Sequence, residues 1–215
     1  MSLAQPIMTA PTKADPSRAP AADISDVGLV RAARAGDRRA HFVIWSRYAT
    51  LVQRLVQRFL GPELDSQDVC QEAFLRIFKR LGELREPAAL QGFVASIALG
   101  VARNESRRRR IRAIVGLVPD EVMMPAPTSP DQGEAREAVR ALYGMLDTLS
   151  AEDRSLFVAR FAEKMELAEV ATVHGMSLST TKRRLARLIA RVNSRVQSSP
   201  VLREYVDVLA KGGSL

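Results

Sequence analysis

Apolar residues recur at helical spacing through residues 26–112, and few glycines or prolines interrupt them. The pattern predicts four helices: a short one around Leu29, a long one that Gly61 ends, a third over about 66–81, and a fourth from about Gln91 into an arginine-rich segment. No segment alternates with period two, so we expect no β-sheet. This helical periodicity constrains the fold more than any other feature, and it predicts an all-α chain.

The core of this part of the chain is expected along the second and third helices. Trp45 and Tyr48 are interpreted as core aromatic residues and Cys70 as a small core residue. The packed stripes are predicted to contain Phe42, Trp45, Leu51, Leu55, Val56 and Phe59 in the second helix, and Val69, Ala73, Phe74, Ile77, Phe78 and Leu81 in the third. A loop is predicted between the third and fourth helices, over 82–90.

Residues 113–133 separate two helical units, because they contain four prolines and no helical stripe. We interpret them as a flexible linker. The 215 residues suffice for two small cores, and we predict two small helical domains at 23–112 and 134–197. Residues 1–22 are rich in Pro, Ala, Ser and Thr and are expected to be disordered, and residues 198–215 are expected to form a tail helix.

The basic excess of the chain is clustered. Lys and Arg number 32 against 24 Asp and Glu, which gives a formal net charge of +8. Six arginines and one glutamate lie within 103–112, and six basic residues and no acid lie within 176–195. Such clusters suit a polyphosphate partner such as a nucleic acid, although each cluster alone is also typical of a solvated helix face.

No metal or cofactor site is predicted. Cys70 is the only cysteine, which excludes internal disulfides and Cys-based metal sites. His41 and His174 have no cysteine or clustered carboxylate beside them. The longest uncharged stretch, 87–102, falls short of the roughly 20 residues that span a bilayer. We therefore expect no membrane insertion and, with one cysteine and no signal peptide, a cytoplasmic location.

Residues 163–192 have the pattern of a helix-turn-helix. A short helix around Leu167 is followed by Gly175, which tolerates a positive φ, and by Ser177, which can cap a second helix. The packed stripe of the second helix is predicted to be Leu178, Thr181, Leu185, Leu188 and Val192. Arg183 projects almost directly away from this stripe, and arginine can pair bidentately with guanine in the major groove. The residues expected to contact duplex DNA are Ser179, Thr180, Lys182, Arg183, Arg184 and Arg187.

The helix predicted at 66–81 carries a polar face as well as an apolar stripe. Glu63 and Asp65 precede it, and acids near a helix start are explained by the helix dipole. Further along, an exposed leucine is surrounded by polar residues that lie off the stripe, an arrangement that suits a protein contact. This face contains Asp68, Gln71, Glu72, Leu75 and Arg76.

Four segments together resemble those of one protein family. They are FVIWSRYATLVQRLVQRFLG (42–61), DSQDVCQEAFLRIFKRL (65–81), FVASIALGVARNESRRRR (93–110) and LDTLSAEDRSLFVARFAEKMELAEVATVHGMSLSTTKRRLARL (146–188). In type, order and separation they resemble bacterial sigma factors of the extracytoplasmic-function type, which keep only the two principal promoter-reading domains. The resemblance covers nearly all the chain from Asp26 to about Val196. It implies binding to core RNA polymerase and to promoter DNA, duplex and single-stranded, with no enzymatic activity; an anti-sigma factor is a usual partner, although no residue identifies one.

The resemblance also implies a role for each surface. The polar face of the third helix corresponds to the segment that docks on the clamp helices of the largest polymerase subunit, which places polymerase binding at Asp68, Gln71, Glu72, Leu75 and Arg76. The loop and fourth helix correspond to the part that melts the minus-ten element and holds a flipped base. Its expected residues are Arg85, Gln91, Arg103, Arg107, Arg108, Arg109 and Arg110. The helix with Arg183 is similar to the one that reads the minus-thirty-five element as a duplex.

The chain departs from the family pattern in the fourth helix. Phe93 and Val94 stand where many members have Trp and Leu, and Leu99 and Gly100 stand where many have Arg and Asn, so this helix is less polar than usual. A sigma-like module that sequesters a partner therefore stays an alternative. A stand-alone helix-turn-helix regulator would leave the polar face without a role, and a serine recombinase would need a sheet domain that the pattern lacks.

Overall fold

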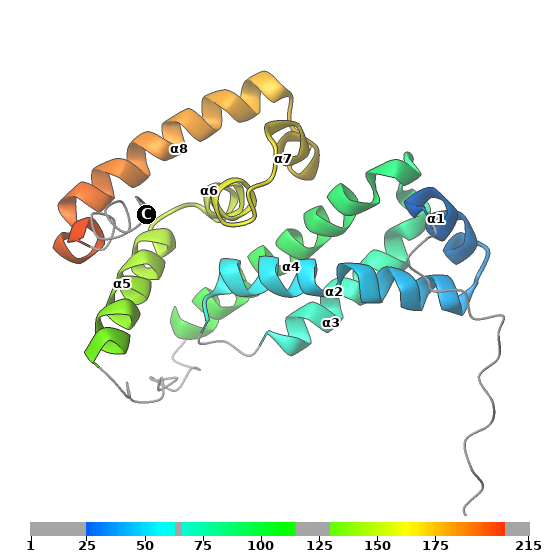
Figure 1. The fold of residues 1–215 in the computed structure, drawn as a ribbon, viewed down its shortest axis with the longest axis horizontal. Helices are drawn as coiled ribbons and strands as arrows, with labels where there is room; N and C mark the ends of the chain where they lie inside the picture. Colours follow the sequence, from blue (N-terminus) through cyan, green and yellow to red (C-terminus); the bar gives the residue numbers. More distant parts are fainter. Residues whose placement is uncertain (1–24, 63–65, 115–129, 205–215) are drawn as a thin grey trace, which may run out of the picture.

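The computed structural model describes residues 25–62, 66–114 and 130–204, and every regular element in these ranges is helical, as the sequence predicts. Figure 1 shows the elements. They are α1 (Asp26–Arg34), α2 (Arg38–Leu60), α3 (Gln67–Arg80), η2 (Leu81–Glu83), η3 (Pro87–Ala89), α4 (Leu90–Ile114), α5 (Pro130–Asp147), α6 (Ala151–Phe157), η4 (Val158–Ala162), α7 (Leu167–Val173) and α8 (Leu178–Ser198). Elements η2 and η3 are 3₁₀ turns, and η4 is a turn of π-helix.

The first domain contains α1 to α4, and α4 packs against both α2 and α3 (Figure 1). Local signals set the ends of α2: Asp37 accepts a hydrogen bond from the backbone N–H of Arg39, and Gly61, with a φ of 107°, follows the last turn. The stripe of α3 is confirmed, because Val69, Ala73, Phe74 and Ile77 are buried. The side chains least exposed in this domain include Leu29, Ile44, Leu55, Phe59, Ile77, Leu90 and Leu99.

Two of the expected core aromatics are on the surface. The prediction is wrong for Phe42, which is 65% exposed, and for Trp45, which is 46% exposed. Trp45 packs one side against Phe74, with 6.4 Å between ring centroids, and Phe42 extends this contact outward at 5.9 Å from Trp45. The buried stripe of α2 runs through Ala40, Ile44 and Tyr48, and Phe42 lies about 200° around the helix from Ile44, on the other side. Tyr48 is buried as predicted and donates a hydrogen bond of 2.6 Å to Asp26.

The segment predicted as a linker is shorter than expected at both ends. Helix α4 continues to Ile114, and α5 begins at Pro130, so both enter the range 113–133. A proline is tolerated in the first turn of a helix because the N–H it lacks would have no partner there. Pro130 therefore starts a helix, although the sequence pattern indicated a break.

Several sequence predictions fall outside the described residues. They concern the disordered segment at 1–22, the acids Glu63 and Asp65, the centre of the linker at 115–129 and most of the tail helix. The described part of that tail, residues 200–204, is helical, and Leu202 is buried there.

The two departures in α4 pack largely inside the protein. Val94 and Leu99 are buried, and Phe93 packs against the same core in a partly buried position. The apolar residues at these positions therefore belong to the core. The lower polarity of α4 leaves few apolar side chains exposed to solvent, because they are packed inside the protein.

The second domain contains α5 to α8. Ser150 caps α6 by accepting a hydrogen bond of 3.1 Å from the N–H of Asp153, as expected for serine at a helix start. The two domains touch: α4 contacts α6 and α7, and α2 contacts η4 (Figure 1). The arrangement brings the arginine-rich end of α4 next to the second domain.

The exposed aromatic in α2 leads to a stability prediction. Ile44 is fully buried and Phe42, two residues away, is mostly exposed. Ile44→Ala should lower the free energy of unfolding by about 2–5 kcal/mol, the usual cost of a cavity in a core, whereas Phe42→Ala should change it by about 0.5 kcal/mol or less. Chemical denaturation followed by circular dichroism measures both. Equal losses in the two variants would contradict the described face of α2.

Candidate functional site

The helix-turn-helix has the predicted form, with one correction. Gly175 takes a φ of 61° in the turn, and Ser177 caps α8 by accepting a hydrogen bond of 3.2 Å from the N–H of Thr180. Thr181, Leu185 and Leu188 are buried on the packed face. Leu178 was predicted to belong to this face but is exposed, because it is the first residue of the helix and lies beyond the contact with α7.

The opposite face of α8 is basic and open to solvent. Lys182, Arg183 and Arg187 are exposed, and none of the three has an ion-pair partner among the described residues. Ser179 is exposed beside them, and Thr180 is half-buried. Five of the six residues predicted to contact duplex DNA therefore lie together at the exposed start of this helix.

Arg184 has a different environment from Lys182, Arg183 and Arg187, because it forms an ion pair inside the domain. Its Nε donates a hydrogen bond of 2.9 Å to Asp153 of α6, and Arg191 donates one of 2.5 Å to the other oxygen of the same carboxylate. The Asp153 side chain is only 8% exposed. Asp153 therefore ties α8 to α6 through two arginines about two turns apart, and this contact sets the direction in which the basic face points.

The ion pairs also change the acidity of this group. Burial alone would raise the pKa of Asp153, but hydrogen bonds from Arg191, Arg184 and Ser150 outweigh it and hold the pKa below its ordinary value. Asp153 is ionised at neutral pH and stabilises the fold in that form.

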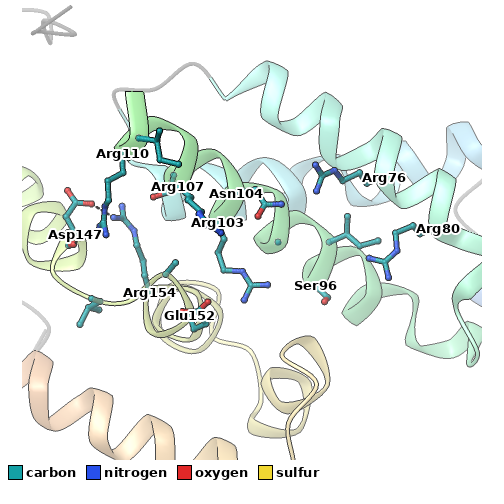
Figure 2. Close-up of a pocket in the computed structure, with 16 residues that line it drawn as sticks. Arg76, Arg80, Ser96, Arg103, Asn104, Arg107, Arg110, Asp147, Glu152 and Arg154 are labelled. Carbon is teal, nitrogen blue, oxygen red and sulfur yellow. Dashed lines mark hydrogen bonds and ion pairs between the residues drawn. The ribbon is translucent and has the colours of Figure 1, made fainter. Parts of the chain in front are cut away.

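The arginines at the end of α4 separate onto two faces. Arg103, Arg107 and Arg110 line a cleft of about 840 Å³ between the domains, together with Arg76 of α3 and Arg154 of α6 (Figure 2). Neither Arg103 nor Arg107 has a hydrogen-bond or ion-pair partner among the described residues. The sequence predicted a single arginine cluster, and the structure places three of its six arginines in this cleft.

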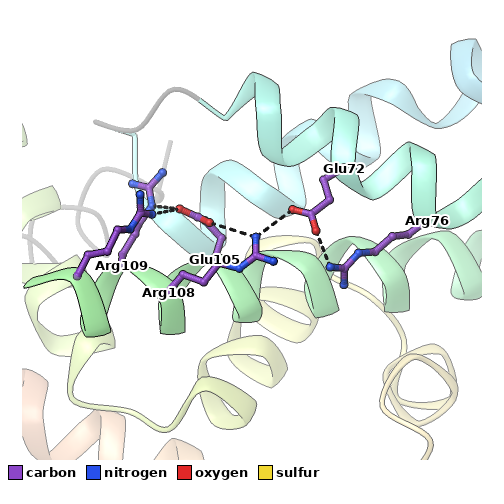
Figure 3. Close-up of polar contacts among 6 residues, drawn as sticks. Glu72, Arg76, Glu105, Arg108 and Arg109 are labelled. Carbon is purple, nitrogen blue, oxygen red and sulfur yellow. Dashed lines mark hydrogen bonds and ion pairs between the residues drawn. The ribbon is translucent and has the colours of Figure 1, made fainter. Parts of the chain in front are cut away.

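The other arginines near the end of α4 are paired with acids of α4 or α3 (Figure 3). Glu105 accepts hydrogen bonds of 2.8 Å from both Arg109 and Arg112. Arg108 lies 3.5 Å from Glu72, which also binds Arg76. Glu72 therefore joins the residues predicted to bind polymerase to one predicted to bind DNA.

The polar face of α3 is exposed next to an apolar groove. Leu75 is 72% exposed, and Asp68 and Gln71 are exposed on the turns that precede it. A groove of about 530 Å³ runs beside them, lined by Trp45, Phe74 and Phe78 among others. The exposed Trp45 of α2 thus belongs to the same surface as the polar face that the sequence indicated. Arg85 and Gln91, predicted for the minus-ten loop, are exposed at the other end of α3 and at the start of α4.

Sequence reasoning missed the residues that join the domains. Arg154 of α6 is buried against the rings of Phe59 and Tyr143, at 5.2 and 5.6 Å from their centroids, and it pairs with Asp147. Glu163, just after η4, pairs with arginines of α2. No periodic pattern could have found these residues, because such a pattern describes one helix and these contacts join two domains.

His174 has a structural environment. It shares a hydrogen bond of 3.0 Å with Ser155 and one of 2.9 Å with the carbonyl oxygen of Val170. Burial lowers its pKa, and the nearby charges of Arg103 and Arg184 lower it further.

Among the described residues, no group of three His, Cys, Asp or Glu side chains is placed to hold a metal ion. None of the helices in the described ranges is long and apolar enough to span a membrane.

A helix-turn-helix with an exposed basic helix, next to a helical domain with an arginine-lined cleft, defines a two-domain nucleic-acid-binding protein. Family models for Sigma-70 region 2 and Sigma-70, region 4 match residues 44–112 and 139–192. The chain belongs to the sigma-70 family of RNA polymerase sigma factors, in the extracytoplasmic-function group. As such it binds core RNA polymerase and directs promoter-specific initiation of transcription.

The relatives of the chain are bacterial. It is 26% identical over 186 residues to the probable RNA polymerase sigma factor RfaY of Xanthomonas campestris pv. campestris, a match that covers 85% of this chain and 45% of that protein. It is 26% identical over 188 residues to the RNA polymerase sigma-H factor of Pseudomonas aeruginosa, covering 83% of this chain and 96% of that one. The fold is similar to that of CnrH, solved in complex with the cytosolic domain of CnrY, with a TM-score of 0.60 and 22% identity over 81% of this chain and 98% of that one. The chain thus spans less than half of RfaY and nearly all of the other two.

The buried carboxylate of Asp153 leads to a pH prediction. Because its folded pKa is lowered, its stabilising contribution is complete above the unfolded value of 3.8 and is lost as pH falls through the lower folded value. Asp153→Asn should lower the free energy of unfolding at neutral pH by about 1.5–3 kcal/mol, the usual range for hydrogen bonds to a charged group. It should also flatten the fall in melting temperature as the pH drops below the unfolded pKa of 3.8.

Glu152→Gln is the matched control, because Glu152 is the exposed neighbour on the same helix. Differential scanning calorimetry across this pH range makes the comparison. A variant with the pH profile of the wild type would show that the Asp153 pairs do not stabilise the fold.

Proposed function

We propose that three separate surfaces of this chain carry the three contacts of a sigma factor. The polar face of α3 with the adjoining apolar groove docks on core polymerase. The cleft face of α4 and the loop before it hold the melted minus-ten strand, and the exposed face of α8 reads the minus-thirty-five duplex. The observation that carries the proposal is the distribution of unpaired positive charge, which gathers in the α4 cleft and on the exposed face of α8.

The α4 surface suits a single strand better than a duplex. Arg103, Arg107 and Arg110 follow one another at four and three residues, so they share one face of the helix over about 10 Å of its length. A narrow positive track of this kind follows a backbone of phosphates. Ser96 and Asn104 line the same cleft and offer hydrogen bonds to bases. Arg108 and Arg109, which face away from the cleft and are paired with Glu72 and Glu105, support the helix from its other side.

The α3 surface suits a protein. Its exposed leucine and apolar groove would gain from burial, whereas its acids would repel a nucleic acid backbone. In this role the chain has no catalytic activity of its own and acts with polymerase in the cytoplasm. An anti-sigma factor is a further partner of the family type, and the relative CnrH was solved in complex with the cytosolic domain of CnrY.

A test of polymerase docking uses Leu75, the most exposed leucine among the described residues. Leu75→Ser should weaken binding to core polymerase by about tenfold or more, the size expected for loss of a well-packed apolar anchor, and should leave the fold intact. Val27→Ser is the control, since Val27 is an exposed apolar residue on α1. Surface plasmon resonance with immobilised core polymerase measures both. Unchanged affinity for the Leu75 variant would remove α3 from the interface.

A test of DNA reading separates base contacts from phosphate contacts on α8. Arg183→Ala should cost roughly 1–3 kcal/mol of binding and relax the preference at one upstream base pair, because a bidentate arginine specifies a base. Lys182→Ala should weaken all promoters alike and lower the slope of the salt dependence by about one unit.

The measurement is transcription in vitro by core polymerase with each variant. The templates are single-base variants of the upstream element, on a promoter first selected from a library with the wild-type protein, at several salt concentrations. The assignment is wrong if Arg183→Ala lowers every template equally while Lys182→Ala changes the preferred base.

A further inference from the structure

An arginine of α1 holds the loop between α3 and α4. Arg34 is the last residue of α1, and its guanidinium contacts loop backbone that lies 47 and 50 residues further along the chain. Its Nε and Nη2 donate hydrogen bonds of 3.2 and 3.1 Å to the carbonyl oxygen of Leu81, and Nη2 also donates to the carbonyl oxygen of Leu84. One side chain of the first helix therefore fixes two points of the loop that precedes α4.

The two carbonyl groups need a partner because helical pairing ends at this point. Helix α3 ends at Arg80 and the 3₁₀ turn η2 ends at Glu83, and carbonyl groups at the end of a helix have no partner within it. The N–H of Leu84 approaches the oxygen of Leu81 at 3.4 Å, a long distance for a hydrogen bond. A guanidinium suits this position, because it offers several donors in one plane and its positive charge complements the end of a helix.

The corner between α1 and α2 sets the position of Arg34. The N–H of Gly36, a residue with a φ of 88°, donates a hydrogen bond of 3.0 Å to the carbonyl oxygen of Ala33. The N–H of Asp37 donates one of 3.1 Å to the carbonyl oxygen of Ala32. These bonds fix the last turn of α1 and the backbone from which the Arg34 side chain extends. Arg34 has no ion-pair partner among the described residues, so no acid competes with the two carbonyl groups for it.

The loop is held on its buried side and open on the other. Leu81 and Leu84 are 2% and 7% exposed, and α1 packs against both η2 and η3 (Figure 1). The exposed residues of the same segment are Gly82, Glu83, Arg85, Glu86 and Ala88. The side of the loop that a nucleic acid can reach therefore depends for its shape on what holds the buried side.

We propose that Arg34 is a positioning residue for the minus-ten contact. By holding the carbonyl oxygens of Leu81 and Leu84, it keeps the loop in the shape that receives a melted base. The proposal rests on the minus-ten role given above to the loop before α4. Arg34 makes no contact with the base in this role and acts through the loop.

A loop that is already in shape binds an extruded base more tightly than one that must be ordered first. Removing a base from the stack costs free energy, which the site that holds the base has to offset. The ion pair within the loop, between Arg80 and Glu83, is a weak substitute for Arg34. Its side chains are 54% and 59% exposed, and exposed pairs contribute little. Loss of Arg34 should therefore let the exposed part of the loop take other shapes.

Charge alone is the competing explanation. Arg34 is exposed and adds positive charge to the side of the domain that carries Arg85, which would attract phosphates without shaping the loop. Lysine separates the two explanations. Its ammonium keeps the charge but lacks the planar fork of donors that binds two carbonyl oxygens in a fixed geometry. Arg34→Lys should therefore behave like Arg34→Ala if the anchor is what counts.

The first experiment tests the anchor in the free, full-length protein. In Arg34→Ala the backbone amides of residues 82–86 should exchange hydrogen at least about tenfold faster than in the wild type, while those in the middle of α3 and α4 keep their rates. Arg31→Ala is the matched control, because Arg31 is an exposed arginine one turn earlier on α1. Hydrogen exchange followed by mass spectrometry makes the comparison. Equal exchange of the loop in Arg34→Ala and the wild type would overturn the anchor.

The second experiment tests the consequence for DNA. Core polymerase with each full-length variant transcribes single-base variants of both promoter elements, on a promoter first selected from a library with the wild-type protein. Arg34→Ala and Arg34→Lys should each lower the preference at one minus-ten position by about tenfold, the size expected for loss of a hydrogen bond from a charged donor. The minus-thirty-five preference should stay unchanged, and Arg31→Ala should match the wild type. Preference is a ratio between templates transcribed by one variant, so a smaller folded fraction does not alter it.

The outcomes of the two experiments are distinct. Full minus-ten preference in Arg34→Lys would show that charge counts and the anchor does not. Faster exchange of the loop with an unchanged minus-ten preference in Arg34→Ala would leave the anchor in place and overturn its positioning role, as would an equal loss at both elements. If the wild type gives no promoter-specific transcript, the proposed function itself fails, and the exchange result still decides whether Arg34 anchors the loop.

Discussion

The structure depends on ion pairs between arginines and a few buried or half-buried carboxylates. The chain has more basic than acidic groups, so the placement of each acid decides which arginines support the fold and which stay available for nucleic acid. Asp153 engages Arg184 and Arg191, and Glu163 engages two arginines of α2. Cations without ion-pair partners in the described residues include Arg103 and Arg107 of the α4 cleft and those on the outer face of α8. Function thus depends on where the acids are as much as on where the arginines are.

The fold was predictable from the sequence because it depends on local signals. The helical period, the caps at Ser150 and Ser177 and the glycine at 175 each act within a few residues of their own position. The errors have a physical cause. The predicted stripe of α2 included Phe42, whereas Ile44 and Tyr48 are the residues that are buried there; which apolar residues of a helix are covered depends on where its neighbours pack. Pro130 is a break in isolation and a helix start once the following residues pack.

The residue types of the candidate site could be predicted from the sequence. Which arginines form ion pairs with which acids could not. The run from Arg107 to Arg110 is one cluster in sequence, but successive residues on a helix are about 100° apart, so the cluster must divide between faces. Which face receives acids depends on Glu72 and on Glu105, and Glu72 is 36 residues from its partner Arg108. Contacts between the domains, such as those of Arg154 and Glu163, cannot be predicted from the periodicity of a single helix.

Helix α4 links these effects because each of its faces meets a different neighbour. Its apolar face carries Val94, Ala98 and Leu99 into the core. A second face presents Arg103 and Arg107 to the cleft, and a third joins Glu72 of α3 through Arg108. In the proposed assignment, polymerase would dock on the face of α3 that contains Glu72, and the strand would lie in the cleft on another side of α4. Glu72 is also the acid of α3 that pairs with Arg108 of α4, so the two proposed surfaces are joined by one ion pair.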